Sequence, residues 1–406
     1  MTSILPFLKS FFPASCHDQV LLVGGTVRDM LLGRENRDLD LVTALPPEEL
    51  SALGFRRVEA TSGATVYFKH GSDFGIIEAT SIKNMDSLEG DLLRRDFTVN
   101  AMAMDLSGKV IDPLGGGEDL KSWRLRACSE EAFRHDPLRL FRAFRFETDG
   151  WRMAPETEAL IRRDDWSAAF SNIPVERFST EMLKALAGEA PERFFQLMIE
   201  FNIGTEILPE LFRMPQIPAG PLQHHPEGDL LAHSIQVLQR VAAANPDPLP
   251  RFCGFFHDLG KLATDPEHYP KHHGHDTTGF GMAVEFCSRL CLPATYRKAL
   301  AWVSSLHGKA NIWDGLRDST KITMAEQAIK GGIVDILPLV AAADKPDGLP
   351  MAGWEDVVRV AGMSTREMAI DQEKLEAMPI RNLPSFILQK RVDVLRELRG
   401  PLHHSG

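Results

Sequence analysis

The sequence of 406 residues predicts a mixed α/β head followed by a mostly α-helical remainder. Residues 20–123 contain short β-like apolar runs that alternate with two helical segments. From about residue 124 the apolar positions recur at helical spacing, and no internal repeat interrupts them. A chain of this length is expected to form two to four domains. We predict four, with boundaries at 1–123, 124–220, 221–350 and 351–406.

The head is expected to contain five strands and two helices. The strands are predicted at residues 19–25, 38–43, 65–70, 74–80 and 109–113, and the helices at 27–33 and 46–53. Four amphipathic helices should follow at 137–146, 155–163, 174–186 and 191–201. Prolines between 209 and 226 mark a connector, the region from 228 is again helical, and an amphipathic packing helix is expected at 389–399.

The composition favours a globular protein of a reducing compartment. Hydrophobic residues make up 44% and charged residues 25% of the chain, and no apolar run approaches the roughly 20 residues that a membrane span needs. The five cysteines are scattered without a CxxC pair, and the N-terminal stretch lacks the basic start of a signal peptide. We therefore expect a cytoplasmic protein without membrane contact. The net charge of −11 argues against a generic nucleic-acid coat but permits a local basic site.

The first stretch with chemical character is residues 22–42, LVGGTVRDMLLGRENRDLDLV. Asp38 and Asp40 alternate in a β-like run, so their carboxylates should point to one face. Hard divalent cations such as Mg²⁺ prefer such oxygens, usually together with substrate phosphates. The glycine pair Gly24 and Gly25 follows a strand, where backbone amides can approach phosphate oxygens closely, and Arg28 comes shortly after.

Three further motifs follow in order. Residues 91–105, DLLRRDFTVNAMAMD, offer the guanidinium forks of Arg94 and Arg95 for phosphate, with Asp96 and Asn100 as polar contacts for a sugar. Residues 112–120, DPLGGGEDL, form a glycine turn for which we expect a structural, interdomain role. Residues 135–146, HDPLRLFRAFRF, predict a helix that begins near Pro137 and carries a polar stripe of Asp136, Arg139, Arg142 and Arg145.

Together these four motifs resemble those of the class II CCA-adding and poly(A) polymerase family of polymerase-β-like nucleotidyltransferases. The resemblance implies template-independent addition or repair of the 3′-terminal CCA of tRNA from CTP and ATP. It implies two Mg²⁺ ions held by Asp38 and Asp40. The triphosphate would lie against Gly24, Gly25 and Arg28, and Arg95 with Asp96 would hold its ribose and phosphates. Asp136 and Arg139 would select the base, and the helical segments would form the neck, body and tail that grip tRNA.

Two departures from the family pattern leave the product open. His135 stands where the family's EDxxR motif has Glu. Only SIKNMDSLEG separates residues 74–80 from DLLRRD at 91–96, whose last three residues we call the RRD motif. Complete CCA-adding members carry a longer loop there, and members with a reduced loop resemble enzymes that add only the two cytidines. A CC-adding enzyme is therefore one alternative, and a poly(A) polymerase is another because its head motifs are nearly the same.

A second set of chemical residues lies in the histidine-rich region. His233, His257, Asp258 and Asp344 follow the order H…HD…D, which resembles the HD phosphohydrolase superfamily, with His275 and His307 as extra ligands. Imidazole and carboxylate ligands from successive helices suit a divalent metal, here Mg²⁺, Mn²⁺ or Ni²⁺. Some bacterial CCA-adding enzymes carry a C-terminal HD domain that resembles a metal-dependent phosphatase and 2′,3′-cyclic phosphodiesterase. The resemblance implies such a domain at 221–350.

Three other interpretations remain at this point. The chain could be chiefly an HD phosphohydrolase whose transferase-like head is regulatory, or its HD domain could be a degenerate scaffold that binds tRNA. A purely RNA-binding protein would leave two complete sets of metal-ligand residue types without a use. The sequence leaves a monomer and a dimer equally open.

Overall fold

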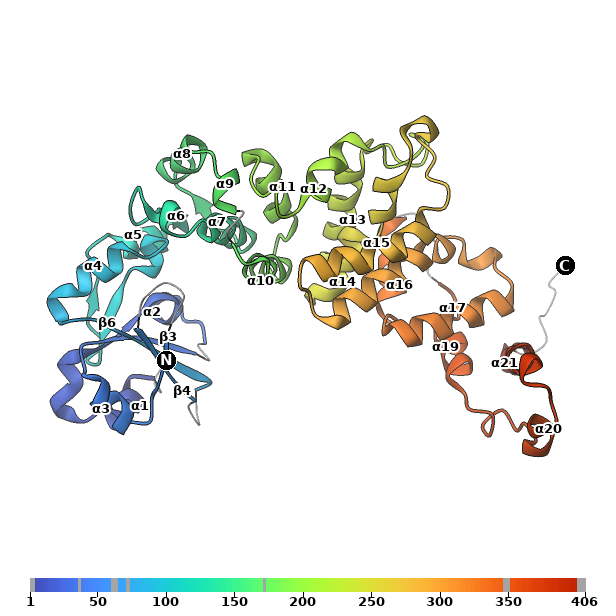
Figure 1. Ribbon diagram of the computed structural model, residues 1–406, viewed down its shortest axis with the longest axis horizontal. Helices are drawn as coiled ribbons and strands as arrows, with labels where there is room; N and C mark the ends of the chain where they lie inside the picture. The colour runs from blue at the N-terminus through green and yellow to red at the C-terminus, as the bar shows by residue number, and fades with distance from the viewer. Residues whose placement is uncertain are drawn as a thin grey trace. The chain divides into compact units, whose positions relative to one another are not determined.

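The computed structural model describes residues 4–35, 38–59, 65–70, 74–170, 173–345 and 351–399, so Asn36 and Arg37 of the first motif lie outside the described residues. The chain forms two compact units, Met1–Ala169 and Phe170–Gly406, which we call the head unit and the helical unit (Figure 1). Their boundary falls inside the segment 124–220, and the division into four domains stays a prediction. No helix of the described residues is long and apolar enough to cross a membrane.

A seven-stranded mixed sheet forms the centre of the head unit. Its spatial order is β3-β4-β5-β2-β1-β6-β7, and β2 pairs with β5 in parallel while the other neighbours are antiparallel. The strands are β1 Val20–Val23, β2 Leu39–Thr43, β3 Arg56–Glu59, β4 Thr65–His70, β5 Ile76–Ser81, β6 Ala103–Asp105 and β7 Val110–Ile111. β1 is apolar and wholly buried, and β2 is buried except at Asp40, which is half-buried.

Eight α-helices precede α9 in the described part of the head unit. They are α1 Ile4–Phe11, α2 Gly24–Leu31, α3 Pro47–Ala52, α4 Leu88–Leu93, α5 Gly116–Lys121, α6 Ala132–His135, α7 Leu138–Thr148 and α8 Pro155–Arg163. A parallel pair of short strands, β8 Arg124–Leu125 and β9 Arg152–Met153, joins the segments on either side of α7. α7 buries Leu140, Phe141 and Phe144, which are spaced as the sequence pattern predicts.

The glycine motif at 112–120 is structural within the head unit. The Asp112 carboxylate accepts hydrogen bonds from the amides of Gly116 and Gly117 at 2.7 and 2.8 Å. The fully buried Asp119 accepts the Thr98 hydroxyl at 2.7 Å. A Cβ on Gly116 would lie 2.2 Å from the Thr98 carbonyl oxygen, so this close contact between α5 and the turn at Thr98–Asn100 requires glycine.

The helical unit contains no strand among its described residues. The short helix α9 Ser167–Phe170 crosses the boundary, because the helical unit begins at Phe170. The helices that follow are α10 Val175–Leu186, α11 Glu192–Phe201, α12 Pro209–Arg213, α13 Leu230–Ala244, α14 Pro248–Phe256, α15 His275–Arg289, α16 Ala294–Ala310, α17 Asp318–Gly331, α18 Ile336–Asp344, α19 Trp354–Gly362, α20 Gln372–Glu376 and α21 Leu383–Arg399. Helices α13, α14, α16 and α18 pack on one another, and α15 packs on α16 (Figure 1).

Two contacts hold the outer parts of the helical unit in place. A Cβ on Gly260 would lie 2.1 Å from the His275 carbonyl oxygen, which allows the turn at Leu259–Ala263 to pack directly on α15. The C-terminal helix α21 buries Val392 and Leu395 against α17 and α19, in agreement with the packing helix that the sequence predicts at 389–399.

The predicted strands and helices are confirmed, with boundaries that shift by one to several residues. The sequence pattern missed the strands β3 and β6 and the short helices α1, α4 and α5, so the expectation of two helices in residues 1–123 was wrong. β3 consists of the largely polar residues RRVE, whose alternation is weak, and β6 has only three residues. Short strands of this kind are specified by their neighbours in the sheet and not by a pattern of their own.

We expect Gly116→Ala to lower the free energy of unfolding of the head unit by about 2–3 kcal/mol, because its new methyl group overlaps the Thr98 carbonyl. Gly90→Ala is the matched control, since Gly90 lies in α4 with no atom within 4 Å of an added Cβ. The control should be neutral or stabilising by roughly 0.5–1 kcal/mol. Calorimetric scans of the two variants check this; equal melting temperatures would contradict the close packing at Gly116.

Candidate active sites

Three carboxylates gather at the end of the parallel pair β2 and β5. Asp40 lies within β2, and Asp38, which is exposed, directly precedes the strand and accepts a hydrogen bond from the Ile76 amide at 2.8 Å. The register pairs Asp40 with Glu78 of β5. Burial, followed by repulsion from Asp38, raises the pKa of Asp40, while nearby arginines oppose the rise. Burial and the charge of Asp40 raise the pKa of Glu78 in the same way.

Arginines from the first two motifs face these carboxylates. Arg95 and Arg28 both act on the charge of Asp40, and a Cβ on Gly24 would lie 2.9 Å from Nη1 of Arg95 and 3.4 Å from Oδ2 of Asp40. Gly24 also has a φ of +68°, which disfavours a side chain there. The glycine therefore keeps open the space where Asp40 and Arg95 meet, at the start of α2. A Cβ on the neighbouring Gly25 would lie 3.6 Å from Arg28.

Asp96 and Asn100 are turned into the protein. The buried Asp96 carboxylate accepts hydrogen bonds from the Phe97 amide, Asn100 Nδ2 and Arg142 Nε, at 2.8, 3.0 and 2.8 Å. Although burial raises the pKa of Asp96, Arg142 and these hydrogen bonds together hold it well below its usual range. Asn100 Oδ1 in turn accepts Arg28 Nη1 at 2.6 Å. The two side chains thus position arginines, and their direct contact with a sugar stays a prediction.

The predicted base-selecting residues lie where the chain enters α7. Asp136 has an extended backbone between α6 and α7, and its carboxylate accepts the Leu138 amide at 3.2 Å. Arg139 donates to the carbonyl oxygens of Arg94, Arg95 and Ala132, at 2.7, 3.2 and 2.9 Å. It therefore ties α7 to the RRD motif. Arg145 lies over the Phe146 ring at 4.4 Å, and Arg28 lies near the same ring at 5.2 Å.

In the helical unit, the residues of the H…HD…D pattern converge. His233 of α13, His257 and Asp258 after α14, and Asp344 at the end of α18 are all buried or nearly so. Nε2 of His233 lies 3.0 Å from Asp344 Oδ1 and 3.6 Å from Asp258 Oδ2. Nε2 of His257 lies 3.6 Å from Asp344 Oδ1 and 3.2 Å from Asp258 Oδ2. These separations suit four ligands of one cation, which are about 3.3 Å apart when the bonds are about 2.0–2.1 Å.

The other oxygen of Asp258 faces a second group. Its Oδ1 lies 3.3 Å from His275 Nε2 and 3.2 Å from His307 Nε2. Oδ1 of Asp276 lies 3.1 and 3.6 Å from the same two nitrogens. Asp276 is not among the ligands that the sequence predicts; its position directly after His275 at the start of α15 was the available signal.

The chemistry of this cluster fits divalent metal. Nε2 of His233 and His257 and Oδ1 of Asp258 and Asp276 are buried and make no hydrogen bond of good geometry among the described residues. Burial lowers the pKa of His257, but the carboxylates of Asp258 and Asp344 outweigh this effect and raise its pKa to about 10. A cation in the first group would give a partner to the two histidine nitrogens, and a cation in the second group would give one to the Oδ1 atoms of Asp258 and Asp276.

Several neighbouring side chains serve other purposes. Lys261 Nζ lies 2.6 Å from Asp258 Oδ2 and donates to the Ala219 carbonyl. His272 contacts the Pro218 carbonyl and Thr264, and His224 and His268 are exposed.

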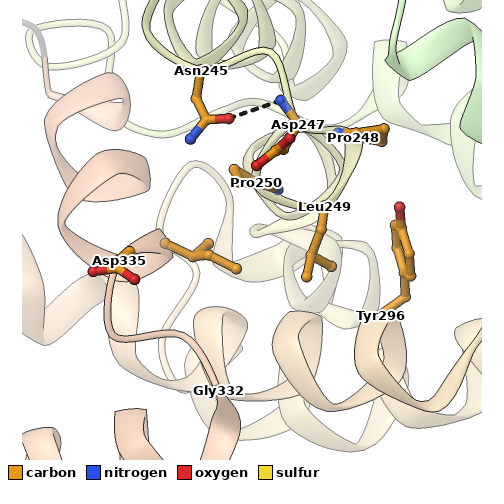
Figure 2. Close-up of a pocket in the computed structure, with 9 residues that line it drawn as sticks. Asn245, Asp247, Pro248, Leu249, Pro250, Tyr296, Gly332 and Asp335 are labelled. Carbon is orange, nitrogen blue, oxygen red and sulfur yellow. Dashed lines mark hydrogen bonds between the residues drawn. The ribbon is translucent and has the colours of Figure 1, made fainter.

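A pocket of about 410 Å³ lies elsewhere in the helical unit. Figure 2 shows it, with the Asn245 side chain accepting a hydrogen bond from the Asp247 amide. None of the predicted site residues lines it, so we assign it no part in either site.

Comparison with known proteins identifies the family. Residues 20–83 and 68–126 match the Poly A polymerase head domain, and residues 150–214 match the probable RNA and SrmB-binding site of polymerase A. The chain is 32% identical over 414 residues to the Multifunctional CCA protein of Methylococcus capsulatus, covering 94% of this chain and 95% of that protein. It belongs to the CCA-adding and poly(A) polymerase family. The Multifunctional CCA protein of Shewanella denitrificans is 34% identical, over 76% of this chain and 78% of its own length.

Solved structures of CCA-adding enzymes share the fold. The Bacillus stearothermophilus CCA-adding enzyme in complex with CTP covers 93% of this chain and 87% of its own, with a TM-score of 0.60 and 24% identity. The Thermotoga maritima CCA-adding enzyme complexed with tRNA has the same coverage, a TM-score of 0.61 and 20% identity. The family therefore accounts for the mixed sheet of the head unit and for the helical unit, as the motifs predicted.

The raised pKa of Asp40 in this family member yields a prediction about stability. Because the folded protein binds a proton at Asp40 more tightly than the unfolded chain does, the free energy of unfolding falls as the pH rises from the unfolded pKa, and the loss is complete above the raised pKa. Without added metal, Asp40→Asn should therefore melt at a higher temperature than the wild type at pH 8, and the gap should shrink as the pH falls toward 4. Thermal scans across this range check it; a gap that grows on acidification would contradict the burial argument.

Proposed function

We propose that this chain is a template-independent tRNA nucleotidyltransferase that adds or repairs the 3′-terminal CCA of tRNA from CTP and ATP in the cytoplasm. The observation that supports this best is the meeting of Asp38, Asp40 and Glu78 with Arg28 and Arg95 at the start of α2. Acidic side chains suit Mg²⁺, and the adjacent guanidinium groups suit the phosphates of a nucleotide. The relatives' names, Multifunctional CCA protein, agree with this reaction.

The residues of the head have separate tasks in this proposal. Asp38 and Asp40 hold Mg²⁺, with Glu78 as a third carboxylate, and bound Mg²⁺ would activate the tRNA 3′-hydroxyl and stabilise the pyrophosphate leaving group. Arg28 and Arg95 bind the triphosphate beside the glycine pair. Asp96 and Asn100 hold Arg142 and Arg28 in place. Asp136 and Arg139 select the base, for which Arg139 exchanges its bonds to main-chain carbonyls for bonds to the nucleotide.

A second activity is proposed for residues 221–350. The buried cluster of His233, His257, Asp258, His275, His307 and Asp344 holds Mg²⁺, Mn²⁺ or Ni²⁺ as an HD phosphohydrolase site. The metal would polarise a phosphate ester toward hydrolysis, as in a phosphatase or 2′,3′-cyclic phosphodiesterase. Lys261, whose ammonium group lies 2.6 Å from Asp258, offsets part of the negative charge of the site. Asp276 joins the ligands on the side of His275 and His307.

One observation favours a narrower product. The segment between β5 and the RRD motif contains only the turn Met85–Ser87 and the six-residue helix α4, with no long loop. A CC-adding enzyme with a reduced loop is thus the second candidate.

A nucleotide-addition assay distinguishes three possible products: CCA, CC and a poly(A) tail. Purified protein is incubated with tRNA lacking its 3′ end plus CTP and ATP, and the products are resolved to single nucleotides. We expect extension by three nucleotides, ending in adenosine. Extension that stops after two cytidines assigns the CC-adding alternative, and a long adenosine tail assigns poly(A) polymerase.

Paired variants separate the two proposed sites. Asp38→Ala should lower CTP incorporation by about 10³-fold or more, because it removes a metal ligand of the transferase site, and should leave hydrolysis of a 2′,3′-cyclic nucleotide unchanged. Asp258→Ala should give the reverse pattern. If Asp38→Ala incorporates CTP at the wild-type rate, the transferase assignment fails. If Asp258→Ala alone leaves hydrolysis intact, the HD assignment fails.

A further inference from the structure

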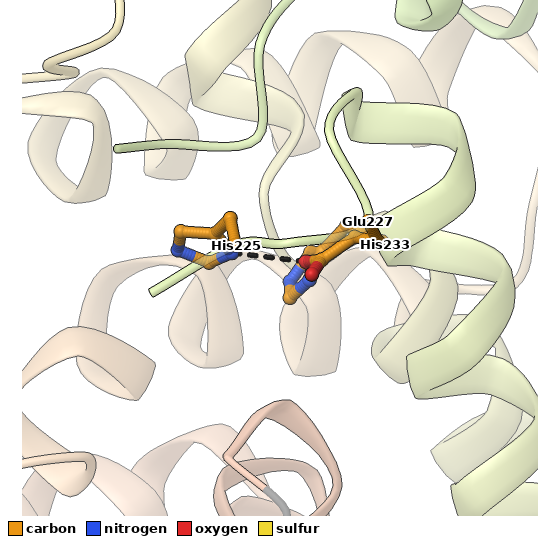
Figure 3. Close-up of side chains that lie close together, drawn as sticks. All are labelled: His225, Glu227 and His233. Carbon is orange, nitrogen blue, oxygen red and sulfur yellow. Dashed lines mark hydrogen bonds and ion pairs between the residues drawn. The ribbon is translucent and has the colours of Figure 1, made fainter. Parts of the chain in front are cut away.

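Glu227 lies at the outer edge of the metal-ligand cluster and contacts two histidines with one oxygen. Figure 3 shows its carboxylate between the rings of His225 and His233. Oε1 lies 2.7 Å from Nδ1 of His233 and 3.0 Å from Nδ1 of His225. The side chain is only 8% exposed, although Glu227 belongs to the loop that precedes α13.

These distances indicate hydrogen bonds and not a third group of metal ligands. Two ligands of one small cation are about 3.3 Å apart when their bonds are about 2.0–2.1 Å, so 2.7 Å is too short. It is the length of a strong N–H···O hydrogen bond to a charged acceptor. Because a carboxylate only accepts, both histidines present an Nδ1–H to Glu227.

The proton on Nδ1 decides what His233 can do with its other nitrogen. In the neutral ring, a proton on Nδ1 leaves Nε2 with a free lone pair. Nε2 is the atom that lies 3.0 Å from Asp344 Oδ1 and 3.6 Å from Asp258 Oδ2, and it makes no good hydrogen bond. Glu227 thus selects the tautomer that can ligate a cation and fixes the plane of the ring.

The surrounding loop holds Glu227 in this position. A Cβ on Gly220 would lie 2.3 Å from the His225 ring, so the loop closes tightly around that histidine. The rings of His225 and His233 meet edge to face with centroids 5.0 Å apart. Two residues after Glu227, the Asp229 carboxylate caps α13 by accepting the Ala232 amide at 2.9 Å. The loop and the helix that carries His233 are therefore a single local structure.

We propose that Glu227 is a positioning residue for the HD site: it holds His233 as a metal ligand, and His225 holds Glu227. This inference rests on the proposed metal site of the helical unit. An outer carboxylate that accepts from a ligating histidine both orients the ring and increases its basicity, and its loss typically weakens metal binding by 10- to 100-fold.

The test measures binding of Co²⁺ to the full-length protein without tRNA or nucleotide. Co²⁺ accepts imidazole ligands, and its visible absorption reports on the ligand set. All proteins carry Asp38→Ala and Asp40→Ala, so that the head contributes no competing site. We expect Glu227→Ala to weaken Co²⁺ binding by about 10- to 100-fold and to change the absorption spectrum. Glu227→Gln keeps an acceptor oxygen and should fall between Glu227→Ala and the parent.

A double-mutant cycle distinguishes positioning from a general effect on folding. Once His233→Ala has removed the ligand, adding Glu227→Ala should change the affinity less than about twofold. Glu206→Ala, at an exposed glutamate of the same unit, is the matched control and should bind as the parent does. An equal loss from Glu227→Ala with and without His233 would overturn the proposal, as would an affinity of Glu227→Ala within twofold of the parent.

Failure of the inference differs from failure of the metal site itself. If the parent binds no more Co²⁺ than its Asp258→Ala variant, the HD metal site is wrong and Glu227 has no ligand to position. If the parent binds Co²⁺ and Asp258→Ala abolishes it, the site stands and the cycle decides the role of Glu227. Melting temperatures of the metal-free variants, measured in parallel, identify any that fail to fold.

Discussion

The arrangement of the head depends on the buried contact between Asp96 and Arg142. The Asp96 carboxylate is buried, and the arginine, Asn100 and a backbone amide offset the cost of burying its charge. Through this one group α7 is bonded to the RRD motif, and Asn100 extends the network to Arg28 near the start of α2. Removing the carboxylate would break its bonds to Arg142 and to Asn100, the side chain that accepts from Arg28. Charges that belong to separate motifs in the sequence form a single network in space.

Both candidate sites contain groups that a cation would stabilise: neighbouring carboxylates in the head unit, and polar atoms without a hydrogen-bond partner in the helical unit. In the head, burial raises the pKa of Asp40 and of Glu78, and a neighbouring carboxylate adds to each rise, Asp38 for Asp40 and Asp40 for Glu78. In the helical unit, buried imidazole nitrogens and carboxylate oxygens lack good hydrogen-bond partners within the described cluster. Such arrangements destabilise the metal-free fold and so make metal binding and folding interdependent. The two sites reach this state differently. The first uses carboxylates on or directly before paired strands, and the second uses side chains from α13, α15, α16, α18 and the turn after α14.

Local patterns made much of this predictable. The alternation of Asp38 and Asp40 and the H…HD…D order are visible in the sequence because each motif is continuous or carries rare residue types. Glu78 escaped notice because only the parallel pairing of β2 with β5 places it beside Asp40. Glu227 was not predicted because a single glutamate in a proline-rich connector belongs to no sequence motif. Its contact with His233 depends on how the loop folds. The weakly alternating strand β3 was missed for the same reason, since pairing with β4 specifies it.

The pairing of β2 with β5 also has a kinetic consequence. Asp40 and Glu78 are far apart along the chain, and β3 and β4 fold between them on the outer side of β5. The loop-closure entropy of this pairing is lost before its contacts are gained, which makes it a late and slow step compared with formation of the local helices. During synthesis, a nascent chain that ends before β5 holds Asp38 and Asp40 without the strand that orders them. The geometry of the candidate metal site in the head therefore depends on closure of this central parallel pair.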